Sequence, residues 1–191
     1  MRGSLAVAGP ATKLFDPFDP VHNEKGRGDG SMSAIWPSER VRAILVTDDG
    51  SLLLLQRRRP GVPTYWVLPG GRVEPGDADL ESALRREIRE ELAGEAEIQA
   101  LFGIIDSDDG SGRQYFFLAR ISTWRFDERN GPEFADRDLA RGTYELDRVR
   151  LTADALAAVN LVPPRVAELI REAVAGAGLF ALGDLRRDFP S

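Results

Sequence analysis

The sequence predicts an α/β protein in which a mixed β-sheet is held between helices. Two observations carry this prediction. Short β-like runs recur between residues 40 and 151. Two other segments place their apolar residues at helical spacing, one after the third run and one near the C-terminal end. Strands and helices in this order favour an α/β/α sandwich, with helices on both faces of the sheet.

Length and composition favour one globular domain with extensions. The chain has 191 residues, of which 42% are hydrophobic, enough for a single core. Residues 1–33 are rich in Gly, Pro, Asp and Ser without a sustained period, and we expect a flexible N-terminal extension there. We expect the domain at residues 34–175 and a loosely packed C-terminal tail at residues 176–191.

Charge and residue types exclude several functional classes. The formal net charge of −6 argues against broad nucleic-acid binding. No apolar run is long enough to span a bilayer, and the N-terminus lacks a secretory signal pattern, so we expect a cytoplasmic protein without a membrane partner. The chain has no cysteine and one histidine, His22 in the extension, which excludes thiol chemistry and a histidine metal site in the domain.

The strands follow from local patterns. Residues 40–47 and 51–58 are β-like runs joined by Asp48-Asp49-Gly50, which indicates a hairpin. A short extended piece at 65–68 leads into a glycine-rich turn. Further strands are expected at 96–105, 113–122 and 142–151, with a polar irregular stretch at 125–141.

The helices have recognisable ends. The first is expected over residues 78–93, with Asp77 or Asp79 as N-cap and Gly94 as its C-terminal stop. A short helical turn is expected at 153–158. Pro163-Pro164 then opens a last amphipathic helix at about 165–175.

The first helix carries glutamates on its buried side. At about 100° per residue, Leu84 and Ile88 fall on one apolar arc, with Glu87 and Glu91 inside it and Glu90 at its edge. Burying carboxylates is unfavourable unless a cation neutralises them. The pattern therefore indicates either pairing with arginines or a bound divalent metal. Oxygen donors without Cys or His favour Mg²⁺, Mn²⁺ or Ca²⁺.

The stretch at residues 70–94, GGRVEPGDADLESALRREIREELAG, resembles the Nudix box, G-x5-E-x7-R-E-U-x-E-E-x-G-U, in which U is aliphatic. Gly71 matches the first glycine, and residues 86–91 match R-E-U-x-E-E. Three departures occur. Asp77 stands in place of the first Glu, the next spacer is one residue longer, and Ala93-Gly94 replaces the final Gly-U pair.

The resemblance implies a Nudix-type α/β/α sandwich with Mg²⁺ as cofactor, for which Mn²⁺ can substitute. It implies Glu87, Glu90 and Glu91 as metal ligands, with the Gly70 carbonyl as a fourth. Glu87 and Glu90 are then catalytic, with Glu87 as the first choice of general base, and Arg86 orients a glutamate through a bidentate pair. A carboxylate from a later loop can be the base instead, and the sequence does not choose among the four candidates: Glu133, Asp136, Asp138 and Glu145.

Basic and aromatic residues before the box are candidates for substrate binding. Arg57, Arg58 and Arg59 end the second strand, and are either a solvated strand end or ligands for phosphates. We predict Arg57, Arg59 and, in the turn, Arg72 as phosphate ligands. Trp66 is the candidate for stacking a base, although an aromatic residue beside a core strand more often packs against the core.

The implied reaction is hydrolysis of a nucleoside diphosphate linked to another moiety. Segments typical of the NADH, ADP-ribose and dinucleoside-polyphosphate groups are absent, which leaves a (deoxy)nucleoside triphosphate, cleaved to NMP and pyrophosphate. The expected partner is a small nucleotide or nucleotide-like diphosphate. Many members are dimers, so a homodimer is retained. Two alternatives remain, a nucleotide-binding or sensor module without turnover and a hydrolase of a specialised biosynthetic diphosphate.

Overall fold

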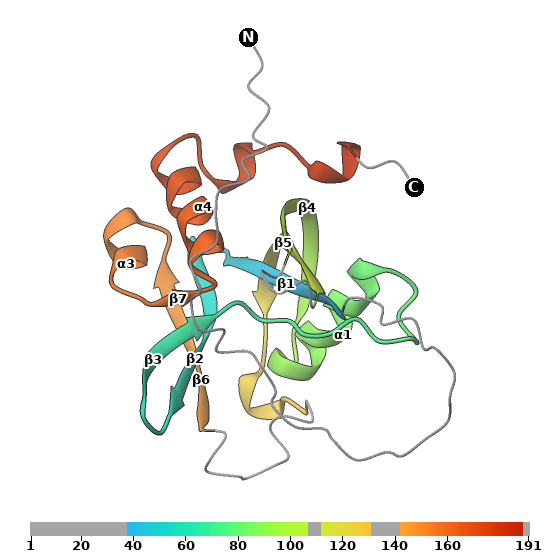
Figure 1. The fold of residues 1–191 in the computed structure, drawn as a ribbon, viewed down its shortest axis with the longest axis horizontal. Helices are drawn as coiled ribbons and strands as arrows, with labels where there is room; N and C mark the ends of the chain where they lie inside the picture. The colour runs from blue at the N-terminus through green and yellow to red at the C-terminus, as the bar shows by residue number, and fades with distance from the viewer. Residues whose placement is uncertain (1–37, 107–111, 131–141, 189–191) are drawn as a thin grey trace. The chain divides into compact units, whose positions relative to one another are not determined.

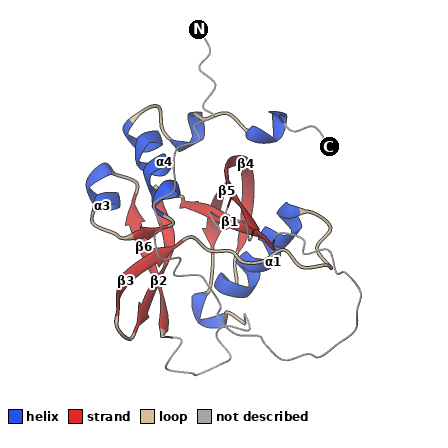
Figure 2. Cartoon of the chain, in the orientation of Figure 1, coloured by secondary structure: helices blue, strands red, loops and turns tan. Residues whose placement is uncertain are grey.

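The computed structural model describes residues 38–106, 112–130 and 142–188, and the expected N-terminal extension lies outside them (Figures 1 and 2). The strands are β1 (Ser38–Thr47), β2 (Ser51–Arg59), β3 (Val62–Val67), β4 (Glu95–Asp106), β5 (Gly112–Thr123), β6 (Thr143–Arg150) and β7 (Leu161–Val162). The α-helices are α1 (Leu80–Leu92), α3 (Ala153–Ala157) and α4 (Pro164–Ala175), and the 3-10 helices are η1 (Phe126–Glu128), η3 (Leu179–Ala181) and η4 (Leu185–Asp188). The predicted elements are confirmed to within a few residues.

The strands form one mixed sheet in the order β4-β5-β1-β2-β3-β7, with β6 also paired to β2. The β1–β2 hairpin is antiparallel, as expected from its Asp-Asp-Gly turn. The β1–β5 and β3–β7 pairs are parallel, and the other pairs are antiparallel. Only the second half of β1 pairs with β2, through Leu45 and Val46. The first half of β1 is therefore available to the glycine-rich turn.

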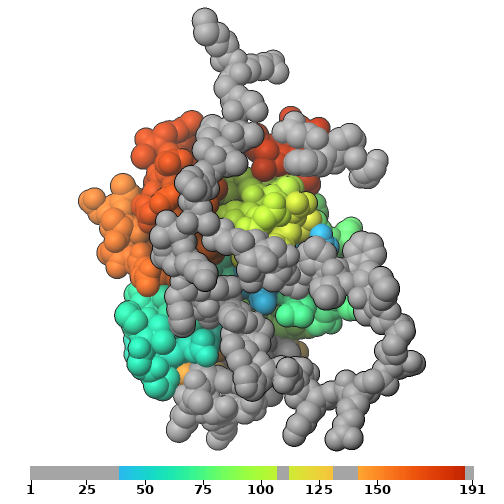
Figure 3. All heavy atoms as spheres, in the orientation of Figure 1, coloured from blue at the N-terminus to red at the C-terminus, as the bar shows by residue number. Residues whose placement is uncertain are grey.

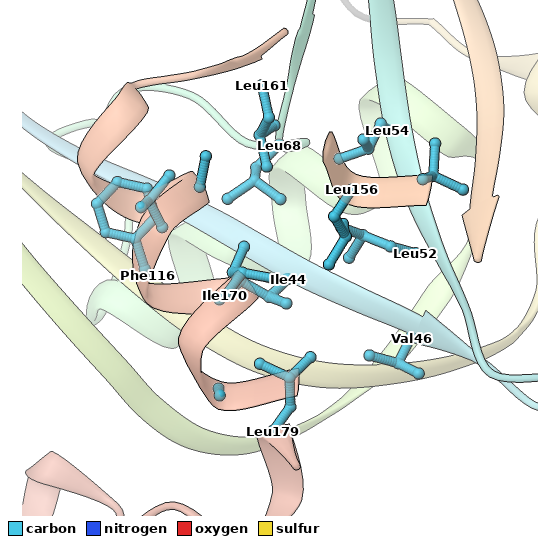
Figure 4. Close-up of a cluster of buried hydrophobic side chains, with 14 of the residues drawn as sticks. Ile44, Val46, Leu52, Leu54, Leu68, Phe116, Leu156, Leu161, Ile170 and Leu179 are labelled. Carbon is cyan, nitrogen blue, oxygen red and sulfur yellow. The ribbon is translucent and has the colours of Figure 1, made fainter. Parts of the chain in front are cut away.

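Helices α3 and α4 cover an apolar side of the sheet. Strand alternation directs Ile44 and Val46 of β1 into this cluster, where they meet Ile170 of α4 and Leu156 of α3 (Figure 4). In the space-filling view, the orange atoms of α3 and α4 lie beside the teal hairpin of β2 and β3 (Figure 3). This cluster forms an apolar core between the sheet and the helices α3 and α4.

Helix α1 packs against β1 and β4. Its apolar residues Leu84, Ile88 and Leu92 are fully buried. The sheet thus carries helices on more than one side, and the predicted α/β sandwich is confirmed. None of the described helices has the length and apolar character needed to cross a bilayer.

The segment after α4 is packed, which corrects the expectation of a loose tail for residues 179–188. Leu179 is buried in the cluster with α4. Asp184 accepts a hydrogen bond from the backbone N–H of Leu101 in β4 at 2.9 Å. Arg186 donates to Glu81 of α1 at 2.5 Å and to the carbonyl of Gln99 at 2.6 Å. These contacts satisfy backbone groups of the edge strand β4, which the sequence pattern of the segment does not indicate.

Candidate active site

The glycine-rich turn runs beside the first half of β1 and continues the sheet. The N–H of Val41 donates to the Gly71 carbonyl at 2.9 Å, and the N–H of Ala43 donates to the Pro69 carbonyl at 2.8 Å. Two successive glycines are required here for different reasons. Gly70 has φ +128°, and a Cβ on it would lie 2.2 Å from the carbonyl oxygen of Val41. A Cβ on Gly71 would lie 2.4 Å from the Glu87 carboxylate.

Helix α1 begins after Asp79, which is one of the two predicted N-cap residues. Asp79 accepts a hydrogen bond from the N–H of Ser82 at 2.6 Å, which satisfies a free donor of the first turn. This start sets the rotation of the helix. Glu87 and Glu91 are consequently only 8% and 6% exposed, as the helical phase predicts, whereas Glu90 is partly exposed.

Arg86 is the centre of an acidic network. Its Nε and Nη2 donate to the two carboxylate oxygens of Asp77 at 3.1 and 3.0 Å. Its Nη1 donates to Glu87 at 3.0 Å and to Glu90 at 3.2 Å. Its Nη2 also donates to the carbonyl of Arg72 at 2.9 Å. Arg86 therefore ties the glycine-rich turn to the helix.

The bidentate pair of Arg86 is formed with Asp77 rather than with a glutamate of the helix. Asp77 stands where the Nudix box has its first Glu, and its side chain is 7% exposed. The Arg86 guanidinium lowers the pKa of the Asp77 carboxyl, and Asp77 raises the pKa of Arg86. The shorter aspartate thus makes a charge-assisted contact at this position despite the longer spacer that follows it.

Glu91 is held by different groups. Its Oε2 accepts a hydrogen bond from the N–H of Gly70 at 2.6 Å. The carbonyl of Gly70 accepts a hydrogen bond from Nη1 of Arg42, a buried residue of β1. Burial lowers the pKa of Arg42, and the Glu91 charge acts in the opposite direction. Arg42 was not identified from the sequence, although an arginine inside the apolar run of residues 40–47 is a signal of a buried charge.

These features form a glycine-rich turn closed onto a helix whose buried side carries glutamates. The model of the NUDIX domain matches residues 37–164, about two thirds of the chain. The chain belongs to the NUDIX family. The resemblance drawn from residues 70–94 is confirmed, and members of this family generally need a divalent metal, usually Mg²⁺.

Relatives of the NUDIX domain include nucleotide hydrolases. The chain is 42% identical over 73 residues to nucleoside triphosphatase NudI of Escherichia fergusonii, covering 37% of the chain and 51% of the relative. It is 35% identical over 79 residues to a putative 8-oxo-dGTP diphosphatase of Bacillus subtilis, covering 41% of the chain and 51% of the relative. Human 8-oxo-dGDP phosphatase NUDT18 is 34% identical over 80 residues, covering 42% and 24%. The chain therefore spans about half or less of these relatives.

Solved structures of the family support the fold. A UDP-X diphosphatase matches with a TM-score of 0.52 and 23% identity, covering 74% of this chain and 64% of that one. An ADP-ribose pyrophosphatase from Streptococcus suis matches with a TM-score of 0.52 and 20% identity, covering 72% and 92%. At these identities, the likeness shows the NUDIX fold alone.

The donor set of the NUDIX helix fits a hard divalent cation in its chemistry. Glu87, Glu90 and Glu91 offer only oxygen, which Mg²⁺ prefers. Asp77, Glu87 and Glu90 contact the guanidinium of Arg86, and Glu91 and Glu87 act electrostatically on Arg42. Within residues 38–106, 112–130 and 142–188, however, no three acidic or histidine side chains are grouped as a metal site. Nη1 of Arg86 contacts both Glu87 and Glu90, whereas the Gly70 N–H contacts Glu91.

The residues expected to bind substrate have other contacts. Arg57 is buried, with its guanidinium carbon 3.4 Å from the ring centroid of Tyr144. Arg58 pairs with Glu145 at 3.3 Å, and both side chains are more than half exposed. Trp66 packs against the core cluster and donates its Nε1–H to Asp147 at 2.8 Å. Trp66 thus has the packing role, and its stacking role stays a prediction, as does phosphate binding by Arg57, Arg59 and Arg72.

A hollow of about 830 Å³ lies at the C-terminal end of α1, lined in part by Arg89, Thr123, Trp124 and Arg125. Its lining does not include the glutamates of the acidic network or Arg86. Because Arg89 lies about 200° around the helix from Glu87, this hollow opens away from the network. We therefore locate the candidate chemistry at the glycine-rich turn and not in this hollow.

Proposed function

We propose that this chain is a Mg²⁺-dependent pyrophosphohydrolase that cleaves a (deoxy)nucleoside triphosphate to NMP and pyrophosphate. The observation that carries the proposal is the arrangement of α1, which buries Glu87 and Glu91 beside a turn whose Gly71 makes room for the Glu87 carboxylate. Binding of a cation and phosphates at this place would explain why a helix buries carboxylates. The names of the NudI and 8-oxo-dGTP diphosphatase relatives support a nucleotide substrate.

In this proposal Glu87, Glu90 and Glu91 hold the cation, with the Gly70 carbonyl as a further oxygen donor. A cation held there would supply neutralisation of phosphate oxygens and a more acidic water. Glu87 accepts a proton from the attacking water, whose oxygen forms a bond to phosphorus. The P–O anhydride bond breaks, and the electron pair leaves with pyrophosphate. Arg86 keeps Glu87 and Glu90 oriented through its two contacts from Nη1.

The alternative bases differ in what supports them. Glu145 lies in β6 and forms an exposed pair with Arg58. Glu133, Asp136 and Asp138 lie outside the described residues. Glu87 is the base that we propose because its buried carboxylate occupies the space that a Cβ on Gly71 would need and is held there by Arg86.

A second candidate function is nucleotide binding without turnover. It is favoured by one observation, the hydrogen bonds from Arg86 to both Glu87 and Glu90, which occupy carboxylate oxygens that a metal would need. A module of this kind would bind the nucleotide and leave the anhydride bond intact.

Product analysis tests the two candidates. The wild type is incubated with canonical and oxidised NTPs, NDP-sugars, ADP-ribose and dinucleoside polyphosphates, each with Mg²⁺ or Mn²⁺. We expect NTPs to yield NMP and pyrophosphate, with a loss of about 100-fold or more in Glu90→Gln, because even the outer partners of a metal site contribute 10- to 100-fold. Glu172→Gln, an exposed glutamate of α4, is the matched control and retains activity.

The outcomes separate the proposals. Equal turnover by wild type and Glu90→Gln would contradict the metal-ligand assignment. If no compound is cleaved but a nucleotide raises the melting temperature, the binding module is the better description. Cleavage confined to NDP-sugars, ADP-ribose or dinucleoside polyphosphates would replace the substrate class and keep the reaction type.

A further inference from the structure

Arg42 is a buried arginine that contacts the candidate metal site. It is 7% exposed, and its neighbours in β1, Val41 and Ala43, are fully buried. Its Nη1 donates to the carbonyl oxygen of Gly70, the backbone oxygen that the Nudix resemblance implies as a metal ligand. A guanidinium therefore contacts an oxygen that a cation would use.

The backbone around this contact is fixed without the Arg42 side chain. The carbonyls of residues 69, 70 and 71 accept hydrogen bonds from residues 43, 42 and 41 of β1, in that order. The first and the last of these bonds come from backbone N–H groups, at 2.8 and 2.9 Å. The N–H of Gly70 is further held by Glu91 at 2.6 Å. Loss of the Arg42 side chain should therefore leave the turn in place.

The charge of Arg42 acts on the same carboxylates as a metal would. Glu91 and Glu87 both attract the Arg42 guanidinium, and Glu91 has the stronger effect. Two cations that share one carbonyl oxygen and one carboxylate repel each other strongly in a partly desolvated site. Removing the guanidinium would free the Gly70 oxygen and remove a like charge, and both changes favour a metal.

We propose that Arg42 is an internal cation that competes with the divalent metal for the Gly70 carbonyl and for the negative charge of Glu91. This inference rests on the proposed function, because it takes the glutamates of α1 as the metal ligands. The metal-free protein is then stabilised by its own guanidinium, and the free protein binds metal weakly. Substrate phosphates bring further negative charge, so the metal binds more firmly with its nucleotide than alone.

The test measures metal binding without substrate. The dissociation constant for Mn²⁺ is determined by electron paramagnetic resonance, and the melting temperature is measured in EDTA, for wild type, Arg42→Met and Arg42→Lys. We expect Arg42→Met to bind Mn²⁺ about tenfold or more tightly and to melt at a lower temperature in EDTA. Arg42→Lys keeps the charge and should stay within about threefold of the wild type in Mn²⁺ affinity.

Arg113→Met is the control, since it removes an arginine of the neighbouring strand β5 that pairs with Asp106 at 2.5 Å and is half exposed. It should leave Mn²⁺ affinity unchanged. A residue with only a structural role would lower both stability and affinity, so opposite changes in Arg42→Met identify the competition. If Arg42→Met does not fold, Arg42→Gln removes the charge while keeping an amide donor, and the same tightening is expected.

The failures are distinguishable. If neither the wild type nor Arg42→Met binds Mn²⁺, the proposed function is overturned, and this inference with it. A wild type that binds Mn²⁺, together with an Arg42→Met variant of equal or weaker affinity, overturns only the role of Arg42. Tightening in both Arg42→Met and Arg42→Lys would assign the effect to hydrogen-bond geometry and contradict competition by charge.

Discussion

The two long helices of the domain bury different kinds of residue. Helix α4 buries Val166, Ala167, Ile170 and Ala173, all apolar, against the sheet. Helix α1 buries Leu84 and Ile88 in the same way, but Glu87 and Glu91 share its buried side. Apolar burial stabilises a fold with no need of specific partners. Buried carboxylates need partners of opposite charge, which Arg86 and Arg42 supply.

Helix α4 stabilises the fold, whereas helix α1 also holds the side chains that we propose as metal ligands and general base. The contacts of α4 can be exchanged for others of similar volume. The contacts of α1 depend on the identity and position of each charged group, including residues of the turn and of β1. Variants that alter one helix at a time should therefore change stability and activity in different proportions.

The largest loss of stability is expected on the α4 side. Ile170→Ala should lower the free energy of unfolding by about 4 kcal/mol, because Ile170 is fully buried and its truncation leaves a cavity. Activity per folded molecule should be unchanged. Urea unfolding gives the first quantity, and kcat measured well below the melting temperature gives the second. A loss of kcat in the folded variant would break the separation between the helices.

A smaller loss of stability, together with a loss of turnover of about 10- to 100-fold, is expected for Arg86→Met. The substitution leaves Asp77, Glu87 and Glu90 without their shared guanidinium, and should cost about 3 kcal/mol at neutral pH. Arg85→Met is the matched control, because Arg85 is exposed and pairs with Glu81 across one helical turn, and should stay within about 0.5 kcal/mol.

The cost of Arg86→Met should depend on pH in a known direction. Arg86 lowers the folded-state pKa of Asp77 below 3.8. A carboxyl with a lowered folded pKa contributes stability that is fully present above its unfolded pKa and is lost as the pH falls through the folded pKa. The difference between wild type and Arg86→Met should therefore narrow below pH 3.8. A difference that is constant from pH 7 to pH 3 would exclude Asp77 as the main partner.

Local patterns predicted most of the fold. The limits of α4 differ from the predicted 165–175 by one residue, since Pro163-Pro164 marks its start. The two-residue strand β7 was not predicted, because its parallel pairing with β3 joins residues about 95 apart. The packing of Arg186 on Glu81 and Gln99 was missed for the same reason. Contacts of this kind depend on which segments meet in space, and no local period records that.

The burial of glutamates on α1 was predicted from the sequence, but their hydrogen-bond partners were not. Helical phase placed Glu87 and Glu91 on the buried side, which is confirmed by their exposure. The convergence of the three glutamates on a metal stays a prediction; in the structure Arg86 contacts Glu87 and Glu90, and the Gly70 N–H contacts Glu91. Helical phase gives the side of α1 on which a glutamate lies but not its hydrogen-bond partner, which for Glu91 is 21 residues away in the chain.

The two helices also end differently, and the smallest predicted effect lies there. Helix α4 ends at Gly176, whose φ is −96°, whereas α1 ends at Ala93, whose φ of +45° lies in the left-handed region that favours glycine. Ala93→Gly should raise the free energy of unfolding by about 0.5–1 kcal/mol, because a Cβ is disfavoured in the left-handed region.

Gly94 cannot provide this relief, because its own role is packing: a Cβ there would lie 3.0 Å from both Ile121 Cδ1 and the Thr123 carbonyl oxygen. The glycine that the Nudix box places at the helix end has thus been displaced to a position fixed by neighbours, and Ala93 retains the strained backbone. Ala175→Gly, at the last residue of α4, is the control and should instead lose up to about 1 kcal/mol. If thermal unfolding shows equal losses in both variants, strain at Ala93 is negligible and the two helix ends are energetically alike.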